Sequence, residues 1–252
     1  KSTKDSTLED GVQFLYGTPN SIALPGERKA GYEIIPSARV YNLIYPIDIS
    51  AILPMKIKSK ILSSMLSPLI SIGYKVLGLK KYLVVRKSKL KVESTSHFPE
   101  EIEKLFDRCC DNYDLIVERK KNYLDWRFVE NPDDYSIYLV KYGELLIGYF
   151  ITKIGSWNSL RVGYVADYLF DEKYLKTFPR IIELIISSFD KSNIQMISMW
   201  STIKNPFYNT ARSYGFLKYQ PVPVICYKNS FGERILSADL RWHFTMADSD
   251  NI

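Results

Sequence analysis

The chain has 252 residues, of which 46% are hydrophobic and 14% aromatic, and this composition excludes a disordered protein and indicates one large or two small globular domains. Its 34 Lys and Arg residues exceed its 28 Asp and Glu residues by a net charge of +6, and they are dispersed, so we expect no nucleic-acid partner. Three cysteines and two histidines exclude a disulfide framework and a His-rich metal site. We therefore expect a reducing, cytoplasmic environment and no bound metal.

The first fifty residues predict a strand, a short helix and two further strands. Residues 11–18 form an apolar run that ends in a turn, which is typical of a buried strand. Residues 21–30 predict a short helix that Gly31 ends. Residues 32–50 contain two strand-like runs, each interrupted by a proline.

Residues 55–87 have a different character. The stretch from Ile61 to Leu79 is apolar apart from Lys75, and lysines flank it on both sides. Its length approaches a membrane span, but a proline, two glycines and several serines argue against a helix that crosses a membrane. We interpret it as a helical connector between domains. The alternative is an interfacial element that gives peripheral membrane contact by binding acidic lipid.

From His97 onward the pattern changes again. The expected elements, in chain order, are an amphipathic helix (PEEIEKLFDRCC), a short helix (KNYLDWRF), a β-hairpin (YSIYLV and ELLIGYFITKI), a third strand (RVGYVADYLF), a helix perturbed early by Pro179 (YLKTFPRIIELIISSF), a fourth strand (NIQMISMWST), a helix (NPFYNTARSYGF) and the last strands (FLKYQPVPVICYK and LRWHFTMAD).

One short motif occurs twice in the chain. The segments SIALPGERKAGY and NPFYNTARSYGF share a polar start, a proline and a helix end at glycine. Aligned, they superimpose Arg28 on Arg212, Gly31 on Gly215, and Tyr32 on Phe216. An apolar strand precedes each copy, which indicates a duplicated architecture.

This succession of elements resembles the GNAT acetyltransferase fold. The resemblance implies an α/β (α+β) protein with a mixed, mostly antiparallel sheet flanked by helices, in tandem with an incomplete first copy. It assigns residues 1–54 to the closing part of the first unit, residues 55–92 to a basic and apolar helical connector, and residues 93–252 to the second unit.

Three stretches, FLYGTPN…PGERKAGY, NYLDWRF and WHFTMADSDN, are similar to landmarks of a bacterial tandem-GNAT group that is often associated with surface-polysaccharide biosynthesis. The resemblance implies an N- or O-acyltransferase that uses acetyl-CoA or another acyl-CoA. Its acceptor would be a small molecule such as an amino sugar or a surface-polysaccharide precursor. The alternative is a degenerate, non-catalytic GNAT-like module that binds a ligand or a partner.

The cofactor site departs from the family pattern. GNAT enzymes hold the CoA pyrophosphate on a Gly-rich loop that enters a helix after the central strand. Here that place reads DEKYLKTFPR, without glycine, and Asp171 and Glu172 stand where phosphate would bind. The candidate cofactor contacts are Lys173, Lys176 and Asn205; for the lysines, the alternative is a solvated helix start. The equivalent loop of the first unit would precede Lys1.

The catalytic residues are equally unusual. Many GNAT enzymes place a Tyr, as general acid, four residues before the glycine that ends the last helix. Ala211 and Glu27 occupy the two equivalent positions. The resemblance leaves Glu27 as a candidate base, and Tyr208 as a residue that reaches a cleft. Asp167, inside an apolar strand, is expected to be paired or to line a substrate cleft. For each, a purely structural role is the alternative.

Overall fold

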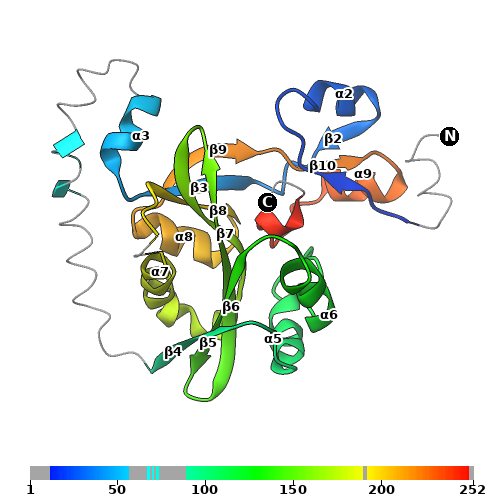
Figure 1. Ribbon diagram of the computed structural model, residues 1–252. Coiled ribbons are helices and arrows are strands. Elements are labelled where there is room, and N and C mark those ends of the chain that lie inside the picture. Colours follow the sequence, from blue (N-terminus) through cyan, green and yellow to red (C-terminus); the bar gives the residue numbers. More distant parts are fainter. Residues whose placement is uncertain are drawn as a thin grey trace.

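A computed structural model describes residues 12–56, 67–68, 70, 72–73, 89–189 and 192–249. Its larger sheet has seven strands in the order β4-β5-β6-β7-β8-β3-β9 (Figure 1). These strands are β4 (Leu90–Thr95), β5 (Tyr135–Tyr142), β6 (Leu145–Trp157), β7 (Leu160–Phe170), β8 (Met196–Thr202), β3 (Val40–Pro46) and β9 (Leu217–Val222). All neighbours pair antiparallel except β7 and β8, which pair parallel. The predicted mixed, mostly antiparallel sheet is therefore confirmed.

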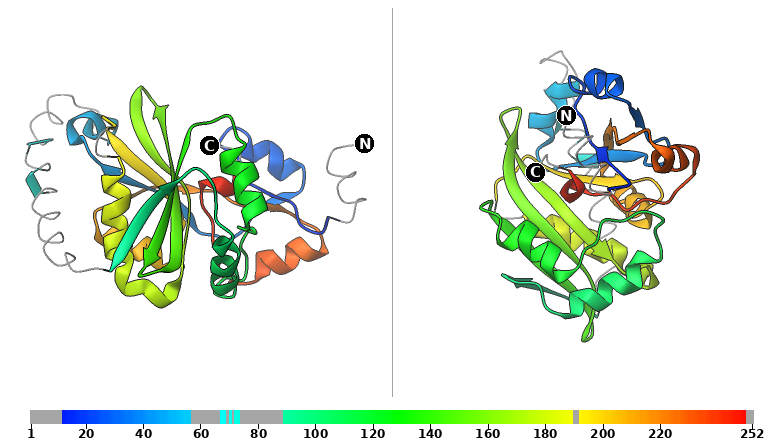
Figure 2. Two further views of the ribbon diagram at one scale, coloured as in Figure 1. Left: turned by 60° about the horizontal axis from the view of Figure 1, so that its bottom comes forward. Right: turned by 90° about the vertical axis from the view of Figure 1, so that its right-hand side faces the viewer.

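Helices cover both faces of this sheet (Figure 2). On one face lie α5 (Glu101–Cys110) and α6 (Lys121–Leu124), which continues into a π-helical turn, η1 (Asp125–Val129). On the other face lie α7 (Phe178–Ser187) and α8 (Pro206–Ser213). The reason is the spacing of apolar residues: α7 buries Phe178, Ile181, Ile182 and Ile185 at helical intervals, and α5 buries a similar stripe.

A second, smaller sheet contains three strands in the order β1-β10-β2, all antiparallel. Its strands are β1 (Tyr16–Gly17), β10 (Ile225–Tyr227) and β2 (Tyr32–Ile34), and α2 (Leu24–Lys29) connects β1 to β2. The strand that follows β2 is β3, which lies in the large sheet between β8 and β9. The strand that follows β9 is β10, which lies in the small sheet between β1 and β2. The N-terminal region thus contributes β3 to the large sheet, and the C-terminal region contributes β10 to the small sheet.

The predicted elements are largely confirmed, with differences at the ends of the chain. Of the described part of the apolar run, residues 12–18, only Tyr16–Gly17 form a strand. The early part of the helix predicted at YLKTFPRIIELIISSF is perturbed, as expected. A 3₁₀ segment, η2 (Glu172–Thr177), comes first, and α7 begins at Phe178 with Pro179 in its first turn. A helix that was not predicted, α9 (Ser230–Ser237), follows β10.

The strand predicted at LRWHFTMAD is wrong. Trp242 makes an isolated bridge to Leu115, and a short 3₁₀ helix, η3 (Met246–Asp248), follows. The physical reason is a capping box, in which the Thr245 hydroxyl and the Asp248 carboxylate satisfy each other's backbone N–H groups and so start a helical turn.

Most of the 55–87 segment lies outside the described residues. α3 (Ile49–Lys56) begins before it, and β4 starts inside the predicted connector. Among the residues that the structure describes, no helix is both long and apolar enough to cross a membrane. The peripheral membrane contact stays a prediction, as does the division into units at residues 54 and 92.

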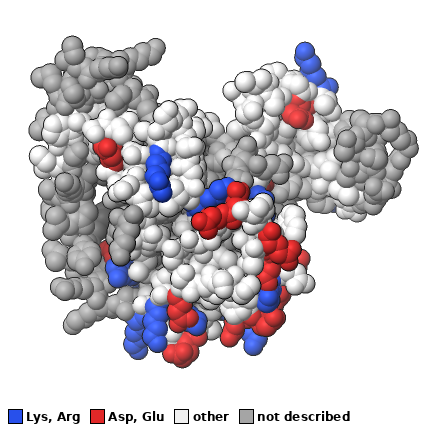
Figure 3. Space-filling model, viewed as in Figure 1, with Lys and Arg blue, Asp and Glu red and all other residues white. Residues whose placement is uncertain are grey.

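Charged side chains show no strong segregation on the face displayed in Figure 3. Lys and Arg side chains are interspersed there with Asp and Glu side chains. Surface ion pairs of the described residues include Lys141 with Glu93 and Lys153 with Asp133. The described residues therefore form no extended basic surface on that face.

Candidate functional site

The central strands β7 and β8 diverge at one end. Their parallel pairing runs from Val162–Met196 to Val165–Met199 and then stops. Both strands continue beyond this point, β7 to Phe170 and β8 to Thr202. The unpaired ends enclose a wedge whose backbone groups need partners from elsewhere.

The C-terminal segment supplies these partners. The Thr202 hydroxyl of β8 donates to the Trp242 carbonyl at 2.7 Å, and His243 Nε2 lies 2.9 Å from the Tyr168 carbonyl of β7. Asn205 Nδ2 lies 3.1 Å from His243 Nδ1. These contacts fit a neutral imidazole with its proton on Nε2. Burial, and then the positive charge of Arg119, lower the pKa of His243 well below its usual value.

A buried ion cluster anchors the same segment. Arg119, fully buried, pairs with Asp167 at 3.2 Å and with Asp248 at 2.7 Å. The Tyr149 hydroxyl donates to Asp167 Oδ2, and the Thr245 hydroxyl donates to Asp167 Oδ1, each at 2.7 Å. Burial raises the pKa of Asp248 although Arg119 opposes the rise. Asp167 is therefore paired in the core, one of the two positions expected for it.

The turn after β7 does not fit a pyrophosphate. The Asp171 carboxylate accepts from the Lys173 backbone N–H at 3.0 Å and pairs with Arg108 at 3.1 Å. Glu172 pairs with Arg241 at 2.6 Å. Two carboxylates thus stand at the helix entry where a phosphate would need N–H donors, and Lys173 is exposed nearby. With the wedge filled as well, this half of the chain lacks the conventional place for CoA.

A large cavity of about 570 Å³ lies on the sheet face that also carries α5. Its floor is formed by alternate residues of the central strands: Tyr164 of β7, Met196, Ser198 and Trp200 of β8, Asn42 and Ile44 of β3, and Gln220 of β9. Leu43, Ile197 and Met199, which alternate with them, face the opposite core under α7 and α8. Alternation therefore sends one set of side chains to the core and the other to the cavity.

The walls of this cavity come from distant parts of the chain. The turn Thr18–Ser21 after β1 forms one side, the end of β9 with the residue after it (Pro221–Pro223) another, and Met246 of the C-terminal segment a third. The strand exchange explains this convergence, because it holds β1 and β9 on either side of the same space. A concave site built where two parts of a fold meet is a typical place for a small ligand.

Similar solved structures identify the fold. A GCN5-related N-acetyltransferase from Anabaena variabilis aligns with a TM-score of 0.54 at 12% identity, over 89% of this chain and 48% of that one. The protein has the GNAT fold. A conserved protein from Enterococcus faecalis described as a probable N-acyltransferase gives a TM-score of 0.54 at 11% identity, over 92% of this chain and 48% of that one.

A functionally unknown protein from Staphylococcus epidermidis gives a TM-score of 0.50 at 10% identity, over 90% of this chain and 77% of that one. This chain spans about half the length of the Anabaena variabilis protein and of the Enterococcus faecalis protein. No protein-family model matches the sequence, and no curated protein matches it significantly. At these identities the GNAT likeness concerns the fold alone.

Within the GNAT fold the predicted site residues lie apart. Tyr208 packs in the core between α8 and the sheet, 6.4 Å from the ring of Tyr41. Glu27 is half-buried and lines an adjoining cavity of about 330 Å³ beside β1, which shares Thr18, Pro19 and Asn20 with the large cavity. Asp167 lies in the ion cluster. The three catalytic candidates therefore share no cavity among the described residues.

The residues predicted to contact the cofactor also lie apart in the structure. Asn205 is buried, caps α8 by accepting from the Phe207 N–H at 2.9 Å, and contacts His243. Lys173 and Lys176 are exposed on η2. Asn205 thus serves the C-terminal segment, while a phosphate contact by the two lysines stays a prediction.

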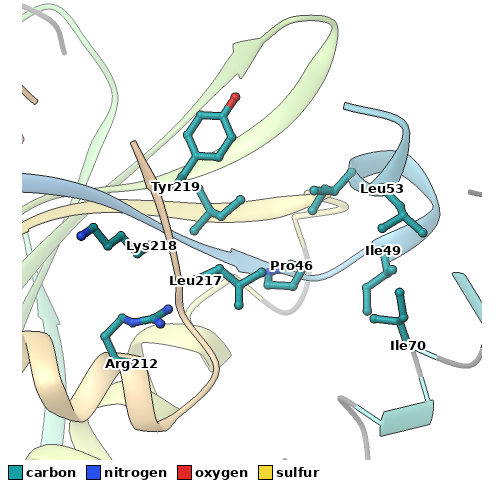
Figure 4. A pocket seen from close by; sticks show the side chains of 10 residues that line it. Pro46, Ile49, Leu53, Ile70, Arg212, Leu217, Lys218 and Tyr219 are labelled. Carbon is teal, nitrogen blue, oxygen red and sulfur yellow. The ribbon is translucent and has the colours of Figure 1, made fainter. Parts of the chain in front are cut away.

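A further cavity, of about 310 Å³, lies between α3 and β9 (Figure 4). Its lining is apolar, with Pro46, Ile49, Leu53 and Leu217, and the Arg212 guanidinium at its edge donates to the Phe216 carbonyl. Because few polar groups converge on it, it has less capacity than the larger cavity to orient a ligand.

The residues of the large cavity were not candidates from the sequence. They are spread from Thr18 to Met246. The wall residues Thr18–Ser21, Leu24 and Met246 fall in the quoted stretches, but the floor residues on the central strands belong to no motif. One signal was present: Asn42 and Ser198 are polar residues inside otherwise apolar strands, the same argument that singled out Asp167.

Proposed function

We propose that this chain forms the acceptor-binding part of an acyl-CoA-dependent N- or O-acyltransferase. The observation that carries the proposal is the large cavity on a GNAT-type sheet, beside a wedge that the chain's own C-terminal segment fills. Acyl-CoA supplies an activated acyl group, and the wedge residues described above do not fit it. The acceptor would be a small molecule such as an amino sugar or a surface-polysaccharide precursor.

The chemistry of the cavity suits an amine or hydroxyl acceptor. Its described lining contains no Asp, Glu, Lys, Arg or His. A partly enclosed site without a carboxylate disfavours an ammonium ion, so it lowers the pKa of a bound amine. A neutral amine keeps the lone pair that would attack the thioester carbon of an acyl-CoA. The new C–N bond would replace the C–S bond, and the departing CoA thiolate would take up the proton that the amine loses.

The second candidate function is a non-catalytic GNAT-like module that binds a ligand or a partner. The filled wedge and the occupied carboxylates at the turn after β7 favour it for this half of the chain. Both candidate functions predict that the large cavity binds a ligand. Only the acyltransferase predicts that an acyl group is transferred to it.

The test is acetyl-CoA titration by calorimetry, with this chain and with the longest natural form of the protein, followed by product analysis with amino-sugar acceptors. Binding and turnover by the longer form alone would support the acyltransferase with this chain as its acceptor-binding part. No binding and no turnover by either form would sink it and leave the binding module.

A further inference from the structure

Polar groups on the cavity floor stand at regular positions on neighbouring strands. Two rungs of the sheet cross the floor, Trp200–Asn42–Gln220 and Tyr164–Ser198–Ile44. Adjacent strands are roughly 4.8 Å apart. The Asn42 and Gln220 amides of the first rung therefore stand about one strand spacing apart, a separation similar to that of alternate hydroxyls on a sugar ring, and each amide can both donate and accept.

One buried contact orients the centre of this floor. Ser198, 2% exposed, donates its hydroxyl to Asn42 Oδ1 at 2.8 Å. This bond directs the Asn42 amide nitrogen, which makes no hydrogen bond to a described residue, toward the cavity that Asn42 lines. Gln220, on the same rung, is exposed and offers a second amide. The site therefore contains one amide held in place by a hydrogen bond, that of Asn42, and one exposed amide that can change its orientation, that of Gln220.

Aromatic rings complete the lining. Trp157 packs edge-on against Tyr219 with ring centroids 5.6 Å apart, and Tyr164 and Trp200 rise from the floor. Flat rings beside amides suit a ligand with both C–H faces and hydroxyl edges. A purely apolar ligand would leave the amides unpaired, at a cost in free energy.

The absence of charged side chains from the described lining restricts the class of ligand further. Since the described lining residues carry no charge, a phosphate, a carboxylate or an ammonium group would lose hydration there without a counter-ion. We propose that this cavity binds an uncharged saccharide unit, with Gln220 and Trp157 as specificity-determining residues. Its identity as the acyl acceptor rests on the proposed function; the binding does not.

The experiment is saturation-transfer NMR with N-acetylglucosamine, glucose, glucose 6-phosphate and glucosamine as probes. The expected result is binding of the two neutral sugars, independent of pH, and no binding of the phosphate. Glucosamine should bind more tightly as the pH rises and its amine loses its proton. Gln220→Ala and Trp157→Leu should each weaken neutral-sugar binding about three- to tenfold.

The matched control is Trp126→Leu, which changes a tryptophan that is 59% exposed and outside the cavity, and it should leave binding unchanged. Gln220 is exposed, so its variant tests binding without a threat to folding. The inference is overturned if no neutral sugar binds, if the phosphate binds equally well, if adenosine or uridine binds in place of sugars, or if neither cavity variant weakens binding. Sugar binding without acyl transfer would refute the proposed function and leave this inference standing. Acyl transfer that neither Gln220→Ala nor Trp157→Leu changes would refute this inference and leave the proposed function standing.

Discussion

Gly31 and Gly215 occupy the same position after the two helices that carry the repeated motif. Each follows a helix that carries the repeated motif, with backbone φ angles of 93° and 102°, and each leads into a strand that flanks the strand received from the other half. The alignment of the two motifs by sequence thus corresponds to a repeated geometry. Only glycine adopts such φ values without strain.

Alanine at either glycine should therefore destabilise the fold. We expect Gly31→Ala and Gly215→Ala each to lower the free energy of unfolding by about 1–3 kcal/mol. Gly26→Ala is the matched control: Gly26 lies inside α2 with nothing within 4 Å of an added Cβ, so alanine there should be neutral or stabilising. Urea denaturation measures all three. A loss at Gly26 as large as at Gly215 would contradict the positional argument.

Local features of this fold were predictable, and its long-range pairing was not. Helical spacing in 101–110 and the glycine after the repeated motif identified α5, α2 and α8, because these signals are contained within a few residues. Nothing in 40–46 indicates that β3 pairs with β8, since periodicity gives the faces of a strand and not its neighbours. The GNAT resemblance supplied the order of elements without this exchange.

The candidate site was less accessible from sequence for the same reason. Asp167 was correctly expected to need a partner, yet its partners Arg119 and Asp248 lie far away in the chain and look like solvated residues. The cavity lining comes from several separate segments, and its neutrality is a property of the assembled surface. Only the folded arrangement brings Asn42 beside Ser198.

Acidification should weaken the attachment of the C-terminal segment. The folded pKa of His243 is depressed, so below its ordinary pKa of about 6.5 the unfolded chain binds a proton that the folded chain does not. Stability present above that pH is then lost as the pH falls, by up to about 1.4 kcal/mol per pH unit. Urea unfolding between about pH 7.5 and about 5.5 measures this slope. His243→Gln should remove it, and the exposed His97→Gln should retain it; persistence of the slope in His243→Gln would refute the assignment.

Removing one member of the buried ion cluster should be costly. Arg119→Met leaves Asp167 and Asp248 without their cation, and we expect a loss of about 3–5 kcal/mol in the free energy of unfolding. Asp133→Asn, which breaks the exposed pair with Lys153, is the control and should change stability by less than about 1 kcal/mol. Equal effects of the two substitutions in chemical denaturation would show that the cluster does not hold the fold.

The three cysteines should differ sharply in reactivity. Burial raises the pKa of Cys109 to about 12 and that of Cys226 to about 11, whereas Cys110 is partly exposed. Near pH 8 the thiolate fraction of Cys109 is then roughly one in ten thousand. Mass spectrometry after brief alkylation should find Cys110 modified first, with all three modified in the urea-denatured protein. Rapid native modification of Cys109 would contradict its burial.

The exchange of β3 and β10 also has a consequence for how such a protein changes over generations. Each half completes the sheet of the other, so neither can be deleted without opening a gap between two strands of its neighbour. A half that has given up its wedge to the C-terminal segment still supplies an indispensable strand. Such a region is retained for the strand that it supplies. Its active-site residues are free to change, whereas the residues that maintain its fold are not.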